Sequence, residues 1–241
     1  RRGKQSPINT MATLAREENR NPGWVALGWL GVVAGFLILS YYSVIAGWAM
    51  SYVFRTGGGM FLGVTGDGVK SIFNELVSDP ERLLAWHTIF MVMTMIVVAR
   101  GVKNGLEKAV TFLMPLLFLL LILIVTYALT TGYFMQGVEF MFSFGPIDGE
   151  AILVAMGHAF FTLSLGMGAI MVYGSYLSDK HSIVQASFMI ALADTVVALL
   201  AGLAIFPIVF ANGLEPGAGP GLIFQTLPIA FGHMEGGTLV G

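Results

Sequence analysis

Long runs of apolar residues without a single charge are the feature that most constrains this chain. The run from Trp24 to Val53 contains no Asp, Glu, Lys or Arg, and the block 114–121 is apolar throughout. A helix needs about 20 mostly apolar residues to cross a bilayer. Hydrophobic residues make up 56% of the chain and charged residues 11%, whereas about 25% of the residues of a soluble domain are charged. The sequence therefore predicts an integral membrane protein.

The apolar runs predict five transmembrane helices in an all-α fold, because backbone groups in lipid must be hydrogen-bonded internally. We expect the whole chain, 1–241, to form a single transmembrane region. The tail 212–241 is rich in Gly and Pro, which predicts a re-entrant or capping loop. The predicted spans are 24–53, 83–99, 109–129, 151–177 and 182–210.

The distribution of basic residues predicts the orientation of these helices, since cytoplasmic loops carry an excess of Lys and Arg. With five alternating helices, nine basic residues fall on the side of the N-terminus and three on the opposite side. We therefore expect a cytoplasmic N-terminus and an external loop 212–241. The nine are Arg1, Arg2, Lys4, Arg16, Arg20, Arg100, Lys103, Lys108 and Lys180, and the three are Arg55, Lys70 and Arg82.

Several function classes receive no support from the sequence. The formal net charge is only -2, so we expect no nucleic-acid partner. The chain contains no cysteine, and its histidines lack the spacing of a zinc site. There is neither a nucleophile elbow nor a phosphate-binding Gly-Lys loop. We therefore expect no enzyme activity and no cofactor.

Two features of the apolar spans are unusual. The fourth span contains Thr162, Ser164, Gly166 and Gly168 close together; this cluster either lets helices pack closely or marks a break in the helix where the backbone lines a cavity. Asp194 lies within the fifth span. An ionisable residue inside a membrane is a functional candidate, and ion or proton chemistry is favoured over a purely structural partner.

The sequence resembles the neurotransmitter:sodium symporter family, including bacterial amino-acid transporters with the leucine-transporter-like fold. The run from Phe160 to Ile170 is similar to the family's unwound sixth helix, and Tyr41-Tyr42 with Trp48 is similar to its third helix. The loop 100–108 resembles the second cytoplasmic loop, and residues 224–238 resemble the fourth extracellular loop. The landmarks occur in the family's order and cover nearly the whole chain.

The resemblance implies an inverted-repeat transporter fold with a discontinuous fourth helix in this chain. It implies that the chain holds family helices three to seven, a partial transporter core in the plasma (inner) membrane. The parent's missing helices would then be partners, together with membrane lipid, an amino-acid substrate and sodium as the coupling ion. The chain alone is not expected to transport.

The resemblance also implies roles for individual residues. Substrate contacts are implied for Ile38, Tyr42, Phe161, Ser164 and Met167. Sodium ligation is implied for Thr162 and Asp194, and these are the only metal ligands expected. Conformational or gating roles are implied for Gly105, Pro115, Gly166, Gly168 and Tyr176.

Asp194 departs from the family pattern, because many members have an asparagine at this position that ligates the first sodium. Its carboxylate supplies the negative charge that chloride gives to animal members, so we expect chloride-independent transport. The apolar residues Ile38, Phe161 and Met167 favour a hydrophobic or aromatic amino acid. Two alternatives stay open: a proton-coupled carrier that uses Asp194, and an amino-acid sensor of the same fold that does not transport.

Overall fold

The computed structural model describes residues 2–143, 145–217, 219–234 and 236–240. Arg1 of the basic N-terminal stretch, and Ala218, Glu235 and Gly241 of the predicted loop, lie outside the described residues. The described residues form helices without strands, which confirms the all-α class. The α-helices are α1 Pro7–Glu17, α2 Val25–Gly57, α3 Gly66–Ser78, α4 Pro80–Ala99, α5 Lys108–Thr130, α6 Phe134–Phe142, α7 Gly149–Thr162, α8 Ala169–Tyr176, α9 Ile183–Ala211, α10 Gly219–Gly221, α11 Leu227–His233 and α12 Gly237–Val240. Shorter elements are η1 Pro22–Trp24 and the π-helical turns η2 Val102–Glu107 and η3 Leu222–Thr226.

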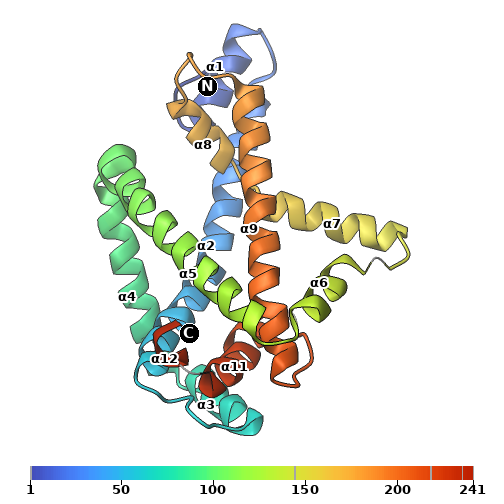
Figure 1. Cartoon of the computed structure of the whole chain (residues 1–241). Coiled ribbons are helices and arrows are strands. Elements are labelled where there is room, and N and C mark those ends of the chain that lie inside the picture. Colours follow the sequence, from blue (N-terminus) through green and yellow to red (C-terminus); the bar gives the residue numbers. More distant parts are fainter. Residues whose placement is uncertain (1, 144, 218, 235, 241) are drawn as a thin grey trace. The chain divides into compact units, whose positions relative to one another are not determined.

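Four helices of the described chain are long and apolar enough to cross a membrane. They are 22–57, 80–99, 104–130 and 183–211, and α7 is a shorter apolar helix. They occupy the segments of the first, second, third and fifth predicted spans. The fourth predicted span is divided into α7 and α8, so the predicted discontinuity is confirmed (Figure 1).

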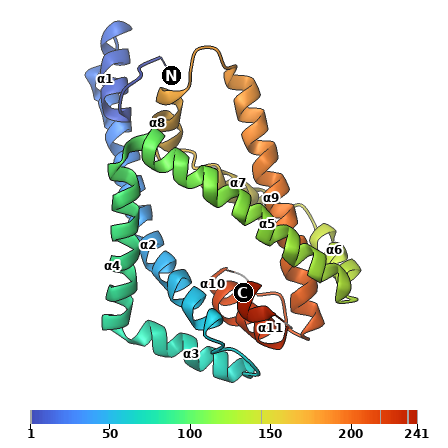
Figure 2. The same ribbon diagram turned by 60° about the vertical axis from the view of Figure 1, so that its left-hand side comes forward.

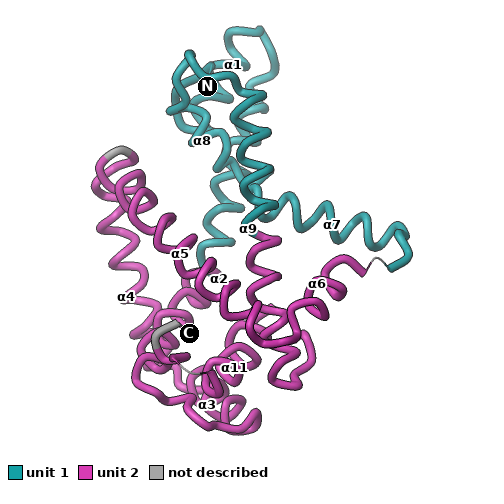
Figure 3. Tube along the Cα trace, in the orientation of Figure 1, with its two compact units in different colours: residues 1–41, 144–197 teal, residues 42–143, 198–241 magenta. Residues whose placement is uncertain are grey.

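The chain divides into two compact units (Figure 3). One contains residues 1–41 and 144–197, and the other contains residues 42–143 and 198–241. Each unit therefore combines segments that are distant in the sequence. The division falls inside α2 and inside α9, so each of these helices contributes residues to both units.

The core of the second unit is an aromatic cluster around the C-terminal half of α2. Tyr52 stacks on Phe61 with ring centroids 5.2 Å apart, and its hydroxyl donates to the carbonyl of Phe224 at 2.9 Å. Trp48 meets Phe224 edge-on at 5.7 Å. Val69 and Leu76 of α3 are fully buried in the same cluster. This cluster holds α3 and the C-terminal segment 219–233 against α2.

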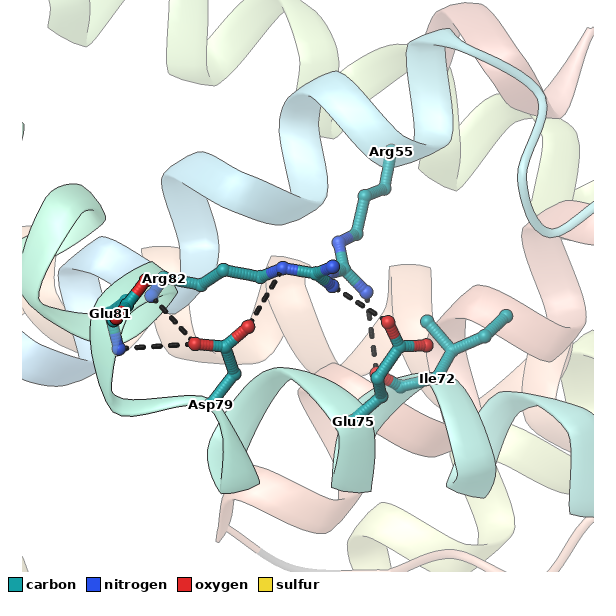
Figure 4. A network of polar contacts seen from close by, with 6 residues as sticks. All are labelled: Arg55, Ile72, Glu75, Asp79, Glu81 and Arg82. Carbon is teal, nitrogen blue, oxygen red and sulfur yellow. Dashed lines mark hydrogen bonds and ion pairs between the residues drawn. The ribbon is translucent and has the colours of Figure 1, made fainter.

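Helix α3 was not predicted as an element, and polar contacts fix it to its neighbours (Figure 4). Asp79 caps α4 by accepting from the amides of Glu81 and Arg82 at 3.1 and 3.0 Å. The Arg82 guanidinium contacts Glu75 at 2.7 Å and Asp79 at 3.0 Å. Arg55 of α2 donates to the carbonyl of Ile72 at 3.3 Å. Figure 2 shows the sharp turn that this cap produces between α3 and α4.

A smaller cluster joins α5, α6, α9 and α11 within the second unit. Ala128, Ile208 and Ala230 are buried together. Helix α6 approaches α9 closely, since a Cβ on Gly137 would lie 2.6 Å from Cγ of Pro207. Phe140 packs on Phe206 with ring centroids 4.8 Å apart. Pro207 lies inside α9, which continues to Ala211.

Candidate functional site

Helix α7 ends in a regular hydrogen-bonded motif just before the Gly-rich segment. Its first turn is capped by Asp148, which accepts from the amide of Ala151 at 2.8 Å. At its other end, the amide of Leu165 donates to the carbonyl of Phe160 at 2.8 Å, and that of Ser164 donates to Phe161 at 3.1 Å. This pair of bonds defines a Schellman motif, in which the residue after the C-cap is left-handed. Thr162 is the last helical residue, so its hydroxyl lies at the break.

Three left-handed residues separate α7 from α8. Ser164 has φ +54°, Gly166 +82° and Gly168 +76°. Glycine adopts this conformation without steric cost, but a serine there costs about 1–2 kcal/mol. Helix α8 then begins at Ala169 with no side-chain cap. The break thus brings the carbonyl end of one helix and the amide end of another into one short segment, the arrangement that binds ions and charged groups in transporters with broken helices.

The predicted substrate residues near the break belong to the first unit. Phe161 is 48% exposed, and Ser164 and Met167 are half-buried. Ile38 lies on the part of α2 that belongs to this unit, and Tyr42 lies one helical turn later, in the second unit. Residues four apart share one face of a helix, so Ile38 and Tyr42 are neighbours along α2.

Asp194 is half-buried in the middle of α9. The helix is regular there, and the neighbouring Thr195 hydroxyl donates to its own helix at the carbonyl of Ala191, 2.9 Å away. None of the described residues forms an ion pair with Asp194. A carboxylate within an apolar helix is costly, and a bound cation is one way to offset that cost.

Three residues with predicted gating roles lie in a π-helical turn, inside a helix and at a helix end. Gly105 is buried in the π-helical turn η2, where a Cβ would overlap the carbonyl oxygen of Val97. Pro115 lies inside α5, which is continuous from Lys108 to Thr130. Tyr176 is the last residue of α8 and is 62% exposed.

One residue at the break was not predicted. Gly31 of α2 is buried, and a Cβ there would lie 3.3 Å from the backbone nitrogen and Cα of Gly168. The backbone at Gly168 is therefore in close contact with the backbone of α2. No sequence signal distinguishes Gly31, which is one of several glycines in a charge-free run.

Comparison with known proteins decides the family. The sodium:neurotransmitter symporter family matches residues 72–241. The chain belongs to this family. Its membership of a family of secondary transporters also agrees with the expectation that it is not an enzyme.

Individual members of the symporter family show how much of the chain is shared. An uncharacterised sodium-dependent transporter of Bacillus subtilis, YhdH, is 41% identical over 239 residues, covering 98% of this chain and 53% of the relative. An uncharacterised sodium-dependent transporter of Haemophilus influenzae is 34% identical over 220 residues, covering 89% of this chain and 48% of the relative. The crystal structure of MhsT in complex with L-phenylalanine superposes with a TM-score of 0.85 at 42% identity, over 100% of this chain and 54% of MhsT. The chain thus spans about half the length of the relatives it matches.

Proposed function

We propose that the complete protein containing this chain is a sodium-coupled amino-acid symporter that works by alternating access. The observation that carries the proposal is the break between α7 and α8 in a chain of this family: it brings the carbonyl end of α7 and the amide end of α8, which has no side-chain cap, together beside the side chains of Thr162 and Ser164. Such groups suit sodium and a zwitterionic substrate, because hard cations prefer oxygen ligands.

The proposed roles of the residues rest on the resemblance to the symporter family. Thr162 at the end of α7 and Asp194 in α9 ligate sodium. Ser164 and the freed backbone contact the polar end of the substrate, which also reaches the Tyr42 hydroxyl. Ile38, Phe161 and Met167 surround its side chain. Gly166 and Gly168 allow α7 and α8 to bend relative to each other, and Gly105, Pro115 and Tyr176 control access from the cytoplasmic side.

The substrate is a hydrophobic or aromatic amino acid. Support comes from the apolar character of Ile38, Phe161 and Met167 and from the L-phenylalanine bound to MhsT. The excess of basic residues on the N-terminal side supports a cytoplasmic N-terminus and an external segment 212–241. The membrane that the protein spans is the plasma (inner) membrane.

Reciprocal binding tests the coupling. If the substrate and sodium share one site, each raises the affinity of the other by the same factor. We expect sodium to increase L-phenylalanine binding by the purified complete protein, and L-phenylalanine to increase sodium binding equally. Thr162→Val should lower sodium affinity roughly tenfold or more, since a lost hydrogen-bonding group at a charge costs about 1.5–3 kcal/mol. Thr195→Val is the matched control, because that hydroxyl bonds within α9.

Chloride dependence tests the role of Asp194. The proposal is that its carboxylate supplies a fixed negative charge beside sodium, so chloride should not change uptake by the unaltered protein. Asp194→Asn removes that charge and should make uptake chloride-dependent. Uptake by the unaltered protein that rises when external chloride is added would reject this role.

A further inference from the structure

The start of α8 lies against the α2 backbone and the ring of Pro7 in the first unit. A Cβ on Gly31 would lie 3.3 Å from Gly168, and a Cβ on Gly168 would lie 3.6 Å from Cα of Gly31 and from Cγ of Pro7. Pro7 is the first residue of α1 and is buried. These neighbours are backbone atoms and a rigid ring, so they cannot rotate away from an added methyl group.

Helix α1 is itself held against α2 at the next turn. Gly28 is buried, and a Cβ there would lie 2.6 Å from Cα of Ile8. The start of α1 is fixed locally, since the Ser6 hydroxyl accepts from the amide of Asn9 at 3.3 Å. The entry to α1 therefore lies in a fixed position on α2, next to Gly168.

The other end of α8 is held by the same N-terminal segment. Lys4 forms an ion pair of 3.2 Å with Asp179, which follows α8 closely. Both side chains are mostly exposed, at 61% and 67%, so the pair contributes little energy by itself. Its importance is positional: the segment that contacts the start of α8 through Pro7 also contacts its end through Lys4.

Within the described residues, the central glycine of α7 has no comparable contact. A Cβ on Gly157, in the middle of α7, would meet nothing within 4 Å. The break thus joins a helix end that is closely packed at Gly168 to a helix whose central glycine is open.

We propose that Lys4, Pro7, Ile8, Gly28 and Gly31 form an N-terminal brace that positions α8 and the break. An effect of the brace on transport rests on the proposed function, whereas the brace itself does not. Gly31 is the positioning residue with the closest contact to the break.

Amide hydrogen exchange of the complete protein in lipid nanodiscs, without substrate, tests the brace. Gly31→Ala should raise exchange of residues 163–176 by about fivefold or more, because exchange follows local opening. Gly35→Ala is the matched control on the same helix, since its Cβ would meet nothing within 4 Å, and it should leave residues 163–176 unchanged. Equal exchange in the two variants, or an equal rise in α3 and α4, would overturn the brace.

A charge exchange gives a second test that does not depend on tolerance of Gly31→Ala. Lys4→Asp should raise exchange of residues 169–176 by about twofold, a small effect because the pair is exposed, and Lys4→Asp with Asp179→Lys should restore it. No rise in the single variant would contradict the contact.

Uptake measurements separate the brace from the transport function. If the complete protein transports, Gly31→Ala should change the maximal rate and leave the substrate concentration at half-maximal rate nearly unchanged. Unchanged uptake with raised exchange would overturn the positioning role in transport. Raised exchange in a protein that shows no transport would leave the brace standing and refute only the proposed function.

Discussion

Ser164 occupies the left-handed position of the α7 C-terminus, a position that glycine usually fills. The two Schellman hydrogen bonds hold it there, so the strain is maintained by the helix end itself. Residues with such strain gather at binding sites and switches. A side-chain oxygen retained at this cost is consistent with the proposed substrate contact.

Replacing Ser164 with glycine should therefore separate stability from binding. Ser164→Gly relieves about 1–2 kcal/mol of strain and loses about 0.5–1 kcal/mol through the flexibility of glycine. We expect a net gain of about 0.5–1 kcal/mol and weaker amino-acid binding. Ser175→Gly is the control: Ser175 is helical and bonded to Val172 at 2.6 Å, so this change should destabilise. Thermal unfolding in detergent measures the stability of both variants. A lower unfolding midpoint for Ser164→Gly than for the unaltered protein would contradict the strain at Ser164.

The Tyr52 hydroxyl makes a single buried hydrogen bond that links α2 to the π-helical turn η3. Tyr52→Phe keeps the aromatic stacking but leaves the Phe224 carbonyl without this donor, at a cost of about 1–3 kcal/mol. We expect a lower unfolding midpoint and faster amide exchange in residues 222–233. Tyr133→Phe, at a 45% exposed position, should change stability by less than about 0.5 kcal/mol.

At the scale of elements, α4 depends on its cap more than on the exposed ion pairs of Figure 4. Asp79 accepts two backbone amides, whereas Arg82 is half-exposed and its ion pairs contribute little, because solvent screens them. Asp79→Ala should cost about 1–2 kcal/mol, and Asp79→Asn clearly less, because asparagine also caps helices. The unfolding midpoints of Asp79→Ala, Asp79→Asn and Arg82→Ala rank the three losses of stability. A loss of stability in Arg82→Ala equal to that in Asp79→Ala would contradict this ranking.

The elements differ in how far the sequence predicted them. Long apolar runs, interrupted by a charge only at Asp194, predicted α2, α4, α5 and α9, because length and apolar character are enough. Helix α3 was overlooked although Val69, Ile72, Phe73 and Leu76 have the i, i+3, i+4, i+7 spacing of an amphipathic helix. Helices α1 and α6 were overlooked as well, because each is short beside the apolar runs that dominate the sequence.

The candidate site was predicted only in part, for a physical reason. The Gly, Ser and Thr cluster indicated either packing or a break, and the structure shows both: α7 ends at Thr162, and Gly168 packs on Gly31. The left-handed conformation of Ser164 and the contact with Gly31 depend on tertiary packing. Residue type alone does not encode them.

At the scale of the whole molecule, the proposed substrate residues are divided between the two compact units. Ile38, Phe161, Ser164 and Met167 belong to one, and Tyr42 belongs to the other. Helices α2 and α9 continue through the division, so each of them contributes residues to both units. The chain spans about half of its relatives, and transport is therefore a property to be tested on the complete protein.

The most direct test is uptake of labelled L-phenylalanine by the complete protein in proteoliposomes, with and without an inward sodium gradient. We expect uptake that requires the gradient, is lost in Ser164→Leu, which fills the break with an apolar side chain, and persists in Ser175→Ala. Uptake driven by a proton gradient without sodium, or binding without uptake across a panel of amino acids by folded protein, would contradict the account.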